Sequence, residues 1–258
     1  MTRIAVLMYG LLAATVGAAS MAYLLGFIGI NALPKACAAV VRSVVRPGID
    51  EELGGPADVA VIVDLALITL FALQHSGMAR PGFKRIWTRI VPEPVERSTY
   101  VLFSSCALAL LFWQWRPIPE VVWDYANPPG RTLWQLLFWL GGAIGIAAAL
   151  SMRSSESLGL PQVFCYARGK VYRPPPFQTP GIYRFVRHPM WLAALLMIWA
   201  TPKITLGHVL FSTAMTLYVA IAIPLAERDL AAEYGDAYRR YRRCTPMLVP
   251  LTRWKSQR

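Results

Sequence analysis

The sequence predicts an all-α, polytopic integral membrane protein, built as a bundle of five to six transmembrane helices. Two observations predict this fold. Only 16% of the 258 residues are charged and the mean hydropathy is +0.43, whereas an average soluble domain carries about 25% charged residues. In addition, the apolar residues are gathered into runs that approach the roughly 20 residues a helix needs to cross a bilayer.

Six apolar runs follow one another along the chain. They cover residues 4–30, 57–76, 98–115, 132–152, 188–201 and 205–226. The fifth run is short, and only "PKIT" separates it from the sixth. We therefore expect these two runs to form a tight helical hairpin that is tilted or only partly spans the membrane. Five full spans plus a re-entrant pair is the alternative to six spans.

The net charge of +12 follows membrane topology instead of marking a nucleic-acid-binding surface. With six spans, 20 of the 26 Lys and Arg residues fall on the side that holds both termini, and six fall on the other side. The positive-inside rule places the basic side in the cytoplasm. We therefore expect both termini, the 152–187 loop and the C-terminal tail in the cytoplasm, and no nucleic-acid partner.

Two sequence patterns exclude other kinds of site. Gly141 and Gly145 stand at GxxxG spacing, which predicts close packing of two helices, and no GxGxxG pattern for a dinucleotide is present. The four cysteines show neither CxxC nor metal-ligand spacing. We expect no metal site and no disulfide framework.

The C-terminal half contains two distinctive polar segments. Residues 173–181, "RPPPFQTPG", are too rich in proline for a helix and predict a rigid extended path. Residues 227–243 predict a single helix, in which Leu230, Tyr234, Tyr238 and Tyr241 recur at helical spacing beside a basic face. Such a helix lies readily on an anionic membrane surface, so membrane lipid is an expected partner.

A helix is predicted to begin at Pro189, within "YRFVRHPMW". Proline suits the first helical position because its missing N–H would be unpaired there anyway. The following backbone N–H groups remain free, and Arg184 and Arg187 flank them, so the segment predicts an anion-binding site. A charged helix cap at the membrane interface is the alternative.

Ionisable residues at membrane depth are costly and are therefore candidates for function. His75 ends the second run and Glu227 follows the sixth, and the topology brings both to the face that holds Arg187 and His188. This coincidence predicts a cytoplasmic-face pocket for a small charged cofactor. The alternatives are an interfacial histidine and a structural Glu–Arg ion pair. His208, at the opposite face, is expected to be structural.

The C-terminal motifs resemble the isoprenylcysteine carboxyl methyltransferase family of membrane enzymes. The resemblance is carried by "GIYRFVRHPMW" and "ERDLAAEYGDAYRRYRRCTPMLVP", against a family pattern of GxYxxxRHPxY, a paired EE and FGxxYxxY. The RHP element is intact at residues 187–189. Trp191, Ala226 and Tyr234 depart from the pattern, whereas Glu227 matches the second glutamate. No contact is therefore carried over for the first.

The remaining segments resemble the bacterial methanethiol S-methyltransferases across nearly the whole chain. They are "LFALQHSGMARPGFKRIWTRIVP", "ERSTYVLFSSCALALLFWQWRPIP" and "WATPKITLGH", of which the first also resembles NnrU-type proteins. The resemblance implies a bacterial inner-membrane enzyme that transfers a methyl group from S-adenosylmethionine to the small volatile thiol methanethiol. It implies a single domain over 1–258, with N-terminal helices in 1–150 and a cofactor-binding loop, hairpin and amphipathic helix in 151–258.

The resemblance also implies roles for particular residues. Arg187 and the helix start suit the carboxylate of the cofactor, and Glu227 suits its ammonium group or a ribose hydroxyl. A thiol attacks as the thiolate, so a proton acceptor or a cationic wall would assist, and His75 and Arg184 are the candidates for catalysis. The candidates for cofactor binding are Tyr183, Arg187, His188, Pro189, Glu227 and Tyr238.

Three alternatives to this function remain at this point. In the first, the protein is still a methyltransferase, but the acceptor is another small thiol or a lipid-linked substrate. In the second, which belongs to a different class, His75 and His188 are axial haem ligands in a membrane electron carrier. In the third, the chain is an NnrU-like accessory protein. The sequence leaves the oligomeric state open.

Overall fold

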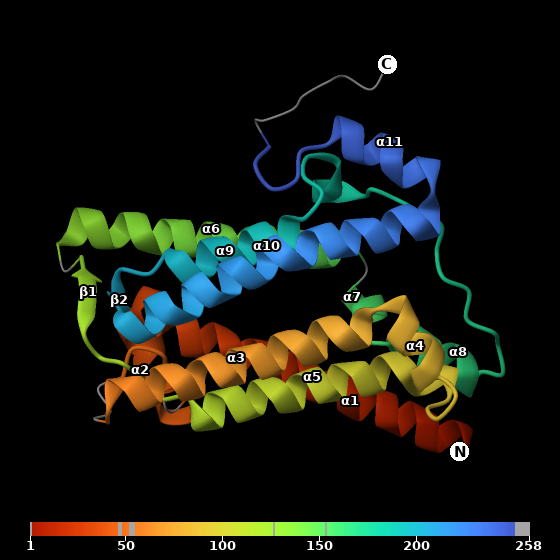
Figure 1. The fold of residues 1–258 in the computed structure, drawn as a ribbon, viewed down its shortest axis with the longest axis horizontal. Helices are drawn as coiled ribbons and strands as arrows, with labels where there is room; N and C mark the ends of the chain where they lie inside the picture. Colours follow the sequence, from red (N-terminus) through yellow and green to blue (C-terminus); the bar gives the residue numbers. More distant parts are fainter. Residues whose placement is uncertain (1, 46–47, 52–54, 126, 153, 251–258) are drawn as a thin grey trace.

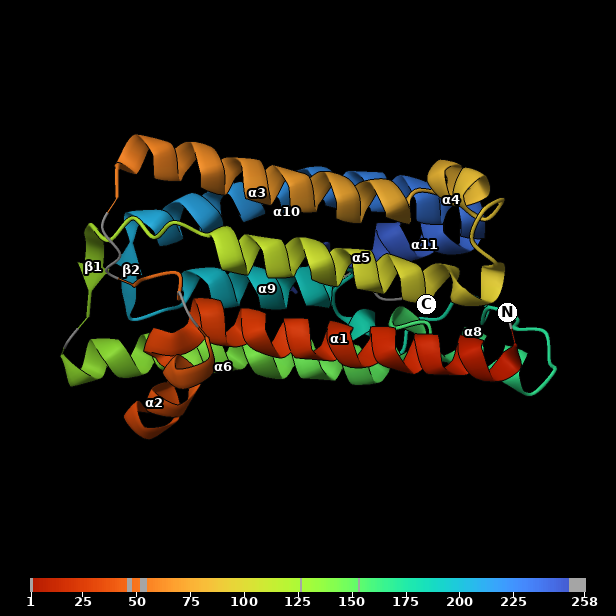
Figure 2. The same cartoon turned by 90° about the horizontal axis from the view of Figure 1, so that it is seen from below.

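The computed structural model describes residues 2–45, 48–51, 55–125, 127–152 and 154–250, and within them five long helices lie side by side as a bundle (Figures 1 and 2). Each of the five is long and apolar enough to cross a membrane. They are α1 (Arg3–Gly29), α3 (Ala57–Ala79), α5 (Glu93–Gln114), α6 (Pro128–Ser151) and α10 (Leu206–Tyr234). The predicted multi-pass, all-α bundle is thereby confirmed.

Shorter elements close the two ends of the bundle. The start of α1 and the helix α11 lie at one end, and a small antiparallel sheet lies at the other (Figure 1). The start of α1 and the helix α11 therefore share one end, whereas the cytoplasmic orientation of that end stays a prediction. Residues 251–258 of the tail lie outside the described residues. The shorter elements are η1 (Ile30–Ala32), α2 (Lys35–Val44), α4 (Pro81–Trp87), β1 (Val121–Asp124), α7 (Ser154–Ser157), α8 (Leu160–Ala167), η2 (Gly181–Arg184), α9 (Pro189–Trp199), β2 (Lys203–Thr205) and α11 (Asp236–Cys244).

The expected hairpin is only half correct, because its second arm is a full span. The helix α9 has 11 residues and is about 16 Å long, well short of the roughly 30 Å hydrocarbon core. The helix α10 has 29 residues, which at about 43 Å is long enough to cross and to extend beyond the core. The chain after α9 continues in extended form into β2, which pairs with β1.

The extended chain after α9 is held by hydrogen bonds to the segment around β1. The Tyr125 amide donates to the carbonyl of Pro202 (2.8 Å), and the Trp123 indole donates to the carbonyl of Thr201 (3.2 Å). Irregular backbone next to lipid is tolerated only when its polar groups are satisfied inside the protein. These bonds explain how a helix can stop short of the bundle end here.

Close helix packing occurs where the GxxxG spacing predicts it. A Cβ atom added at Gly141 of α6 would lie 2.8 Å from Cγ of Met197 and 3.1 Å from the carbonyl oxygen of Ala193, both on α9. An aromatic core, Phe27, Phe112, Trp115 and Phe211, joins α1, α5 and α10 with ring-centroid distances of 5.3–6.2 Å. The short helix α9 is thus fixed against α6 by direct backbone approach.

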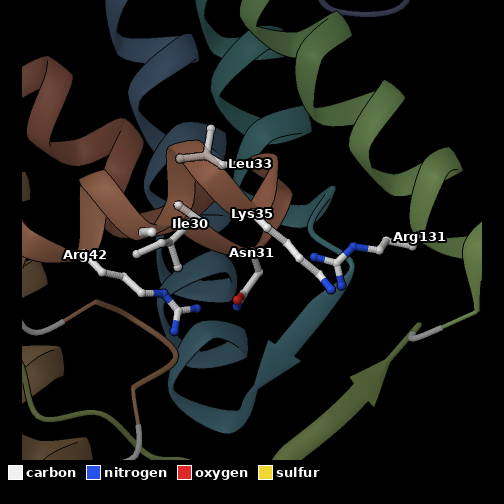
Figure 3. A pocket seen from close by; sticks show the side chains of 8 residues that line it. Ile30, Asn31, Leu33, Lys35, Arg42 and Arg131 are labelled. Carbon is white, nitrogen blue, oxygen red and sulfur yellow. The ribbon is translucent and has the colours of Figure 1, made fainter.

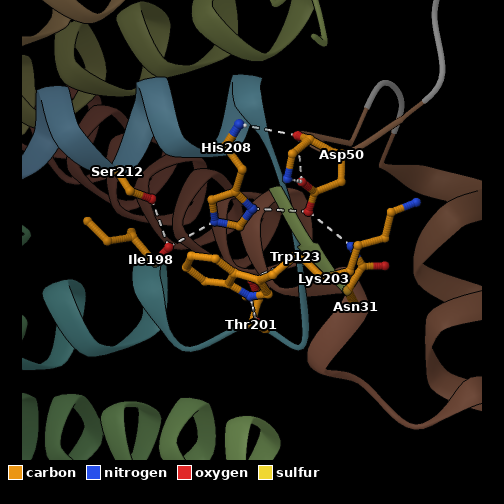
Figure 4. Close-up of polar contacts among 9 residues, drawn as sticks. Asn31, Asp50, Trp123, Ile198, Thr201, Lys203, His208 and Ser212 are labelled. Atoms are coloured by element: carbon orange, nitrogen blue, oxygen red, sulfur yellow. Dashed lines mark hydrogen bonds and ion pairs between the residues drawn. The ribbon is translucent and has the colours of Figure 1, made fainter. Parts of the chain in front are cut away.

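A buried polar network ties together the end of the bundle that carries the sheet (Figure 4). Asp50 lies 3.0 Å from Nδ1 of His208 and accepts from the Thr205 hydroxyl (2.8 Å) and the Asn31 amide (2.9 Å). Nε2 of His208 donates to the carbonyl of Ile198 (2.8 Å), one of the last carbonyls of α9. His208 is fully buried, and its structural role stays a prediction.

Replacing His208 by alanine is expected to lower the free energy of unfolding by about 3–5 kcal/mol, because it leaves the buried Asp50 carboxylate without its imidazole partner. Chemical unfolding in detergent micelles measures this change. The matched control is Asp236→Asn, which breaks an exposed pair with Arg239 (2.9 Å) and is expected to cost less than about 0.5 kcal/mol. Equal costs for the two variants would contradict the structural role of the network.

The C-terminal segment forms two helices, so the prediction of one continuous helix over 227–243 is wrong. Gly235 has φ +56°, a conformation that favours glycine and ends α10. The chain then reverses into α11, where Tyr238 and Tyr241 are buried instead of facing lipid. Both rings pack against Phe177 of the proline-rich loop, with centroids 5.8 and 5.6 Å away.

Candidate active site

A buried carboxylate joins three separate segments at the end of the bundle that carries α11. Glu227 of α10 is 4% exposed, and its Oε1 accepts from Nε of Arg187 at 2.6 Å. Nε2 of His188 lies 3.0 Å from the same oxygen, and Nε of Arg242 on α11 lies 3.2 Å from Oε2. The sequence placed Arg187, His188 and Glu227 at one face, and the structure brings them into direct contact.

Arg187 also fastens α11 to the segment that precedes α9. Its Nη1 donates to the carbonyls of Arg242 (3.0 Å) and Thr245, which lie at the C-terminal end of α11 where carbonyls lack helical partners. The backbone amide of Arg187 donates to Pro246 (2.9 Å) and that of His188 donates to Met247 (3.1 Å). Backbone and side-chain hydrogen bonds therefore both hold the RHP element against the chain at the end of α11. Much of the hydrogen-bonding capacity of the Arg187 guanidinium is taken up by groups of the protein.

The helix α9 begins at Pro189, as predicted. Pro189 is buried at the first helical position, and no side chain among the described residues caps this end. The first intrahelical bond runs from the Leu192 amide to the carbonyl of His188 (3.1 Å), so the amides of Met190 and Trp191 precede it. A helix start of this kind attracts an anion.

His188 is held as a neutral ring beside the carboxylate. Burial lowers the pKa of His188, and this effect outweighs the nearby Glu227 carboxylate, which acts in the opposite direction. In the neutral form, a hydrogen on Nε2 donates to Glu227, and Nδ1 is left as an acceptor. His188 therefore presents an acceptor nitrogen next to the start of α9.

Tyrosines of α11 complete the wall around Glu227. Tyr238 is 1% exposed, and its hydroxyl has no hydrogen-bond partner of good geometry among the described residues. Burial, followed by the Glu227 carboxylate, raises the pKa of Tyr238 to about 12. The Tyr241 hydroxyl donates to the carbonyl of Tyr183 (2.6 Å), and burial raises the pKa of Tyr183.

Arg184 lies at the end of η2, three residues before Arg187, with an exposed side chain. In the part of the chain that the structure describes, it forms no ion pair, in contrast to Arg187. Of the two arginines expected to form a cationic wall, Arg184 is thus the one whose charge is available to a ligand.

His75 belongs to a second polar cluster, between α3 and α5. Its ring nitrogens lie 2.9 and 3.1 Å from the Tyr100 hydroxyl, and Nδ1 lies 3.1 Å from the Ser104 hydroxyl. Phe71 stacks on the His75 ring with centroids 5.2 Å apart. A histidine with two hydroxyl neighbours and an aromatic wall is suited to accept a proton in a site with little water.

Tyr218 of α10 connects the two clusters. Its hydroxyl accepts from Ser76 of α3 at 3.1 Å, and its ring lies 6.5 Å from Phe71 and 5.8 Å from Trp191. Trp191 is two residues after Pro189, so a chain of contacts runs from the start of α9 to His75. Trp191, which departs from the tyrosine of the resembled pattern, is the aromatic residue that makes this contact.

Comparison with known proteins identifies the family. Residues 64–252 match the family described as NnrU protein. The chain is 43% identical to the methanethiol S-methyltransferase of Mycobacterium tuberculosis, over 97% of this chain and 98% of that protein. The chain belongs to the methanethiol S-methyltransferase family.

Other relatives agree with this assignment. The chain is 40% identical to the methanethiol S-methyltransferase of Crocosphaera subtropica, over 99% of this chain and 96% of that protein. It is 43% identical to methanethiol S-methyltransferase 2 of Bradyrhizobium diazoefficiens, over 96% of this chain and 91% of that protein. No solved structure matches the chain. The prediction of a membrane-embedded thiol methyltransferase is confirmed at the level of the family.

The NnrU match spans both clusters, because residues 64–252 contain His75 as well as the RHP element and the α11 tyrosines.

Several residues of the site were missed at the level of sequence. Tyr100 and Ser104 recur four residues apart in α5, which is a weak signal, and Tyr218 lies inside an apolar run without any distinguishing motif. Their proximity to His75 comes from helix packing.

Proposed function

We propose that the protein transfers a methyl group from S-adenosylmethionine to methanethiol, giving dimethyl sulfide. The observation that carries this proposal is the meeting of Arg187, His188 and Glu227 beside the uncapped start of α9, with the His75 cluster joined to it through Tyr218. Membership of a family whose members are named methanethiol S-methyltransferases supports the same reaction.

The donor set at the start of α9 fits the polar groups of S-adenosylmethionine, which carries a carboxylate, an ammonium and ribose hydroxyls. The Met190 and Trp191 amides and the exposed Arg184 would hold the carboxylate. Nδ1 of His188 would accept a hydrogen bond from one of the remaining groups. The buried Tyr238 hydroxyl, which has no partner of good geometry among the described residues, would donate one to another. Pro189 starts the helix, and Tyr183 fixes α11 through its carbonyl.

Arg187 has a different proposed role from the one implied by resemblance. Its Nε and Nη1 are bonded to Glu227 and to the end of α11, so Arg187 acts as a positioning residue and not as the direct carboxylate ligand. It holds the Glu227 carboxylate in place and closes α11 over the site. Glu227 in turn orients His188 and contributes the negative charge that an ammonium group requires.

The chemistry divides between the two clusters. Bound S-adenosylmethionine supplies a methyl group on a positively charged sulfur. His75 accepts the proton of the thiol at a ring nitrogen, and the thiolate that results is the nucleophile. Tyr100 and Ser104 orient the ring, while Phe71, Tyr218 and Trp191 form an apolar wall that keeps water away and fixes the direction of approach.

The haem-ligand alternative receives no support from the geometry. Nε2 of His188 is bonded to Glu227, whereas both nitrogens of His75 face the Tyr100 hydroxyl. The aromatic side chains of Tyr218 and Trp191 lie between the two clusters. The imidazole rings of His75 and His188 therefore do not face each other as two axial ligands of one haem iron would. A haem Soret band in the purified protein would restore this alternative.

A headspace assay tests the reaction. A membrane fraction with the protein is incubated with methanethiol and S-adenosylmethionine labelled in its methyl group, and labelled dimethyl sulfide is expected. Ethanethiol and longer thiols in place of methanethiol, together with extraction of labelled lipid, distinguish the other acceptors. A Glu227→Gln variant serves as the inactive control. Label in lipid without labelled dimethyl sulfide would contradict the proposed acceptor.

We also propose that the site end of the bundle faces the cytoplasm of a bacterial inner membrane, with both termini on that side. The excess of basic residues at this end supports the orientation. An impermeant thiol reagent applied to intact cells is expected to label a cysteine introduced at the exposed Arg116 in a Cys37→Ser background, and the Cys37→Ser variant alone provides the control. Labelling of Cys244 instead would invert the orientation.

A further inference from the structure

A basic cavity lies at the end of the bundle opposite the candidate active site (Figure 3). It has a volume of about 290 Å³ and is formed by η1, α2 and the first turns of α6. Lys35, Arg42 and Arg131 line it, together with the apolar side chains of Ile30 and Leu33. Neither cluster of the proposed methyltransferase site contributes to it.

Among the described residues, the charged side chains that line this cavity are all positive. The ends of the Lys35 and Arg131 side chains point toward one another, and Arg42 lies on the other side of Asn31 (Figure 3). The described residues that line the cavity include no carboxylate. The side-chain amide of Asn31 donates a hydrogen bond to Asp50 (2.9 Å), which does not line the cavity. Two cations that face each other repel, and an anion between them removes that repulsion.

The basic residues are also concentrated in an unusual way for this side of the membrane. By the topology, only six of the 26 Lys and Arg residues belong to this side, and two of them, Lys35 and Arg131, converge on this cavity. The positive-inside rule disfavours basic residues here. Their convergence is therefore not explained by membrane orientation and points to a ligand of negative charge.

The cavity lies at the depth of lipid headgroups. The helix α1 ends at Gly29 and α6 begins at Pro128, so Lys35 and Arg131 sit at the level where the spans end. The helix α2 projects from the bundle (Figure 2) and has no buried residue. Its Val40 and Val44 are 69% and 71% exposed, as expected for an amphipathic helix whose apolar face lies in a membrane interface.

We propose that this cavity binds the phosphate of an anionic phospholipid, with Lys35 and Arg131 as its ligands. The acyl chains then run along the exposed apolar face of α2. A headgroup phosphate and a free phosphate share the same chemistry, and the adjoining apolar face favours the lipid. Binding here fixes α2 and the start of α6 to the membrane and does not depend on the proposed methyl transfer.

Lipid titration of the full chain in neutral detergent tests the site, with native mass spectrometry as the readout. The probes are phosphatidylglycerol, phosphatidylcholine and inorganic phosphate as a competitor. Each basic side chain in direct contact with the headgroup contributes about a fivefold gain in affinity for anionic lipid, so the double variant K35Q/R131Q is expected to bind phosphatidylglycerol about 25-fold more weakly. The variant K35R/R131K, which keeps both charges, is expected to retain binding.

The matched control is R116Q, which removes one exposed basic residue from the same side but outside the cavity. Its affinity for phosphatidylglycerol is expected to stay within about twofold of the wild type, and phosphatidylcholine is expected to bind more weakly than phosphatidylglycerol. Unchanged binding by K35Q/R131Q, or an equal loss in R116Q, would overturn the site. Displacement of the lipid by inorganic phosphate would make it a free-anion site and overturn the lipid proposal. Retained helical circular dichroism in each variant shows that folding is intact.

Discussion

Replacing Arg187 by alanine is expected to weaken S-adenosylmethionine binding by more than about 100-fold. The change leaves the Glu227 carboxylate buried, with 6% of its side chain exposed, after loss of its shortest ionic contact. Breaking a buried ion pair in this way costs about 3–5 kcal/mol of folding free energy. In the variant, cofactor binding has to restore the geometry of the site, and about 3 kcal/mol used in this way corresponds to a factor of more than 100 in affinity. Isothermal titration calorimetry on the detergent-solubilised protein measures the dissociation constant.

Two further arginine variants separate positioning from direct binding. Arg187→Lys keeps a positive charge near Glu227 but loses the bonds from Nη1 to the end of α11, so an intermediate affinity and faster proteolysis at α11 are expected. Arg184→Ala removes an exposed charge, and it is expected to weaken binding without changing the proteolysis of α11. Unchanged affinity in Arg187→Ala would refute the positioning role.

The parts of the fold that follow from local chemistry are visible in the sequence. Long apolar runs specify spans because a helix in lipid must present apolar side chains over its whole length. Pro189 marks a helix start because of its own covalent geometry. Counting spans then brings His75, His188 and Glu227 to one face without any knowledge of packing. Each of these inferences depends on a short stretch of chain.

The parts that depend on which helices become neighbours are not visible in this way. The Asp50–His208 contact joins residues 158 positions apart, and the Ser76–Tyr218 contact joins residues 142 positions apart. An apolar run that is exposed to lipid on one side and packed on the other carries little periodic signal to predict its partners. The break at Gly235 is different: the glycine is evident, but its positive φ depends on the docking of Tyr238 and Tyr241.

Whether Arg187 meets a ligand or a protein carboxylate is a packing question of the same kind. Its position beside a helix start predicts an anion, and an anion is indeed bound, but it is Glu227 of the chain itself. A structural ion pair between Glu227 and a neighbouring arginine is the alternative that the sequence also predicts. The structure agrees with a structural ion pair and leaves room for an anion site. The Arg187–Glu227 ion pair forms directly beside the uncapped first turn of α9, where a second anion can bind.

Replacing His75 by alanine is expected to lower turnover by about 100-fold to 10,000-fold, the usual contribution of a proton acceptor. Affinity for S-adenosylmethionine is expected to stay nearly unchanged, because His75 contacts Tyr100 and Ser104 and not the Glu227 cluster. Turnover measured by dimethyl sulfide release, together with calorimetry on the same preparation, tests this separation. Equal loss of turnover and affinity would move His75 into the cofactor-binding shell.

The pH dependence of the His75→Ala variant identifies the role of the histidine more sharply than its residual activity. A thiol with a pKa near or above that of cysteine, about 8.5, is mostly protonated at neutral pH, and its thiolate fraction rises about tenfold per pH unit below that pKa. Without His75, only pre-formed thiolate reacts, so turnover is expected to climb by about this factor as the pH rises. The wild type should depend less steeply on pH, because His75 accepts the proton within the site.

Tyr100→Phe, which keeps the ring but removes the hydroxyl bonded to His75, is expected to lower turnover by a smaller factor and to leave the shallow pH profile in place. A His75→Ala variant whose activity stays equally low at every pH would show that the histidine positions the thiol and does not take its proton.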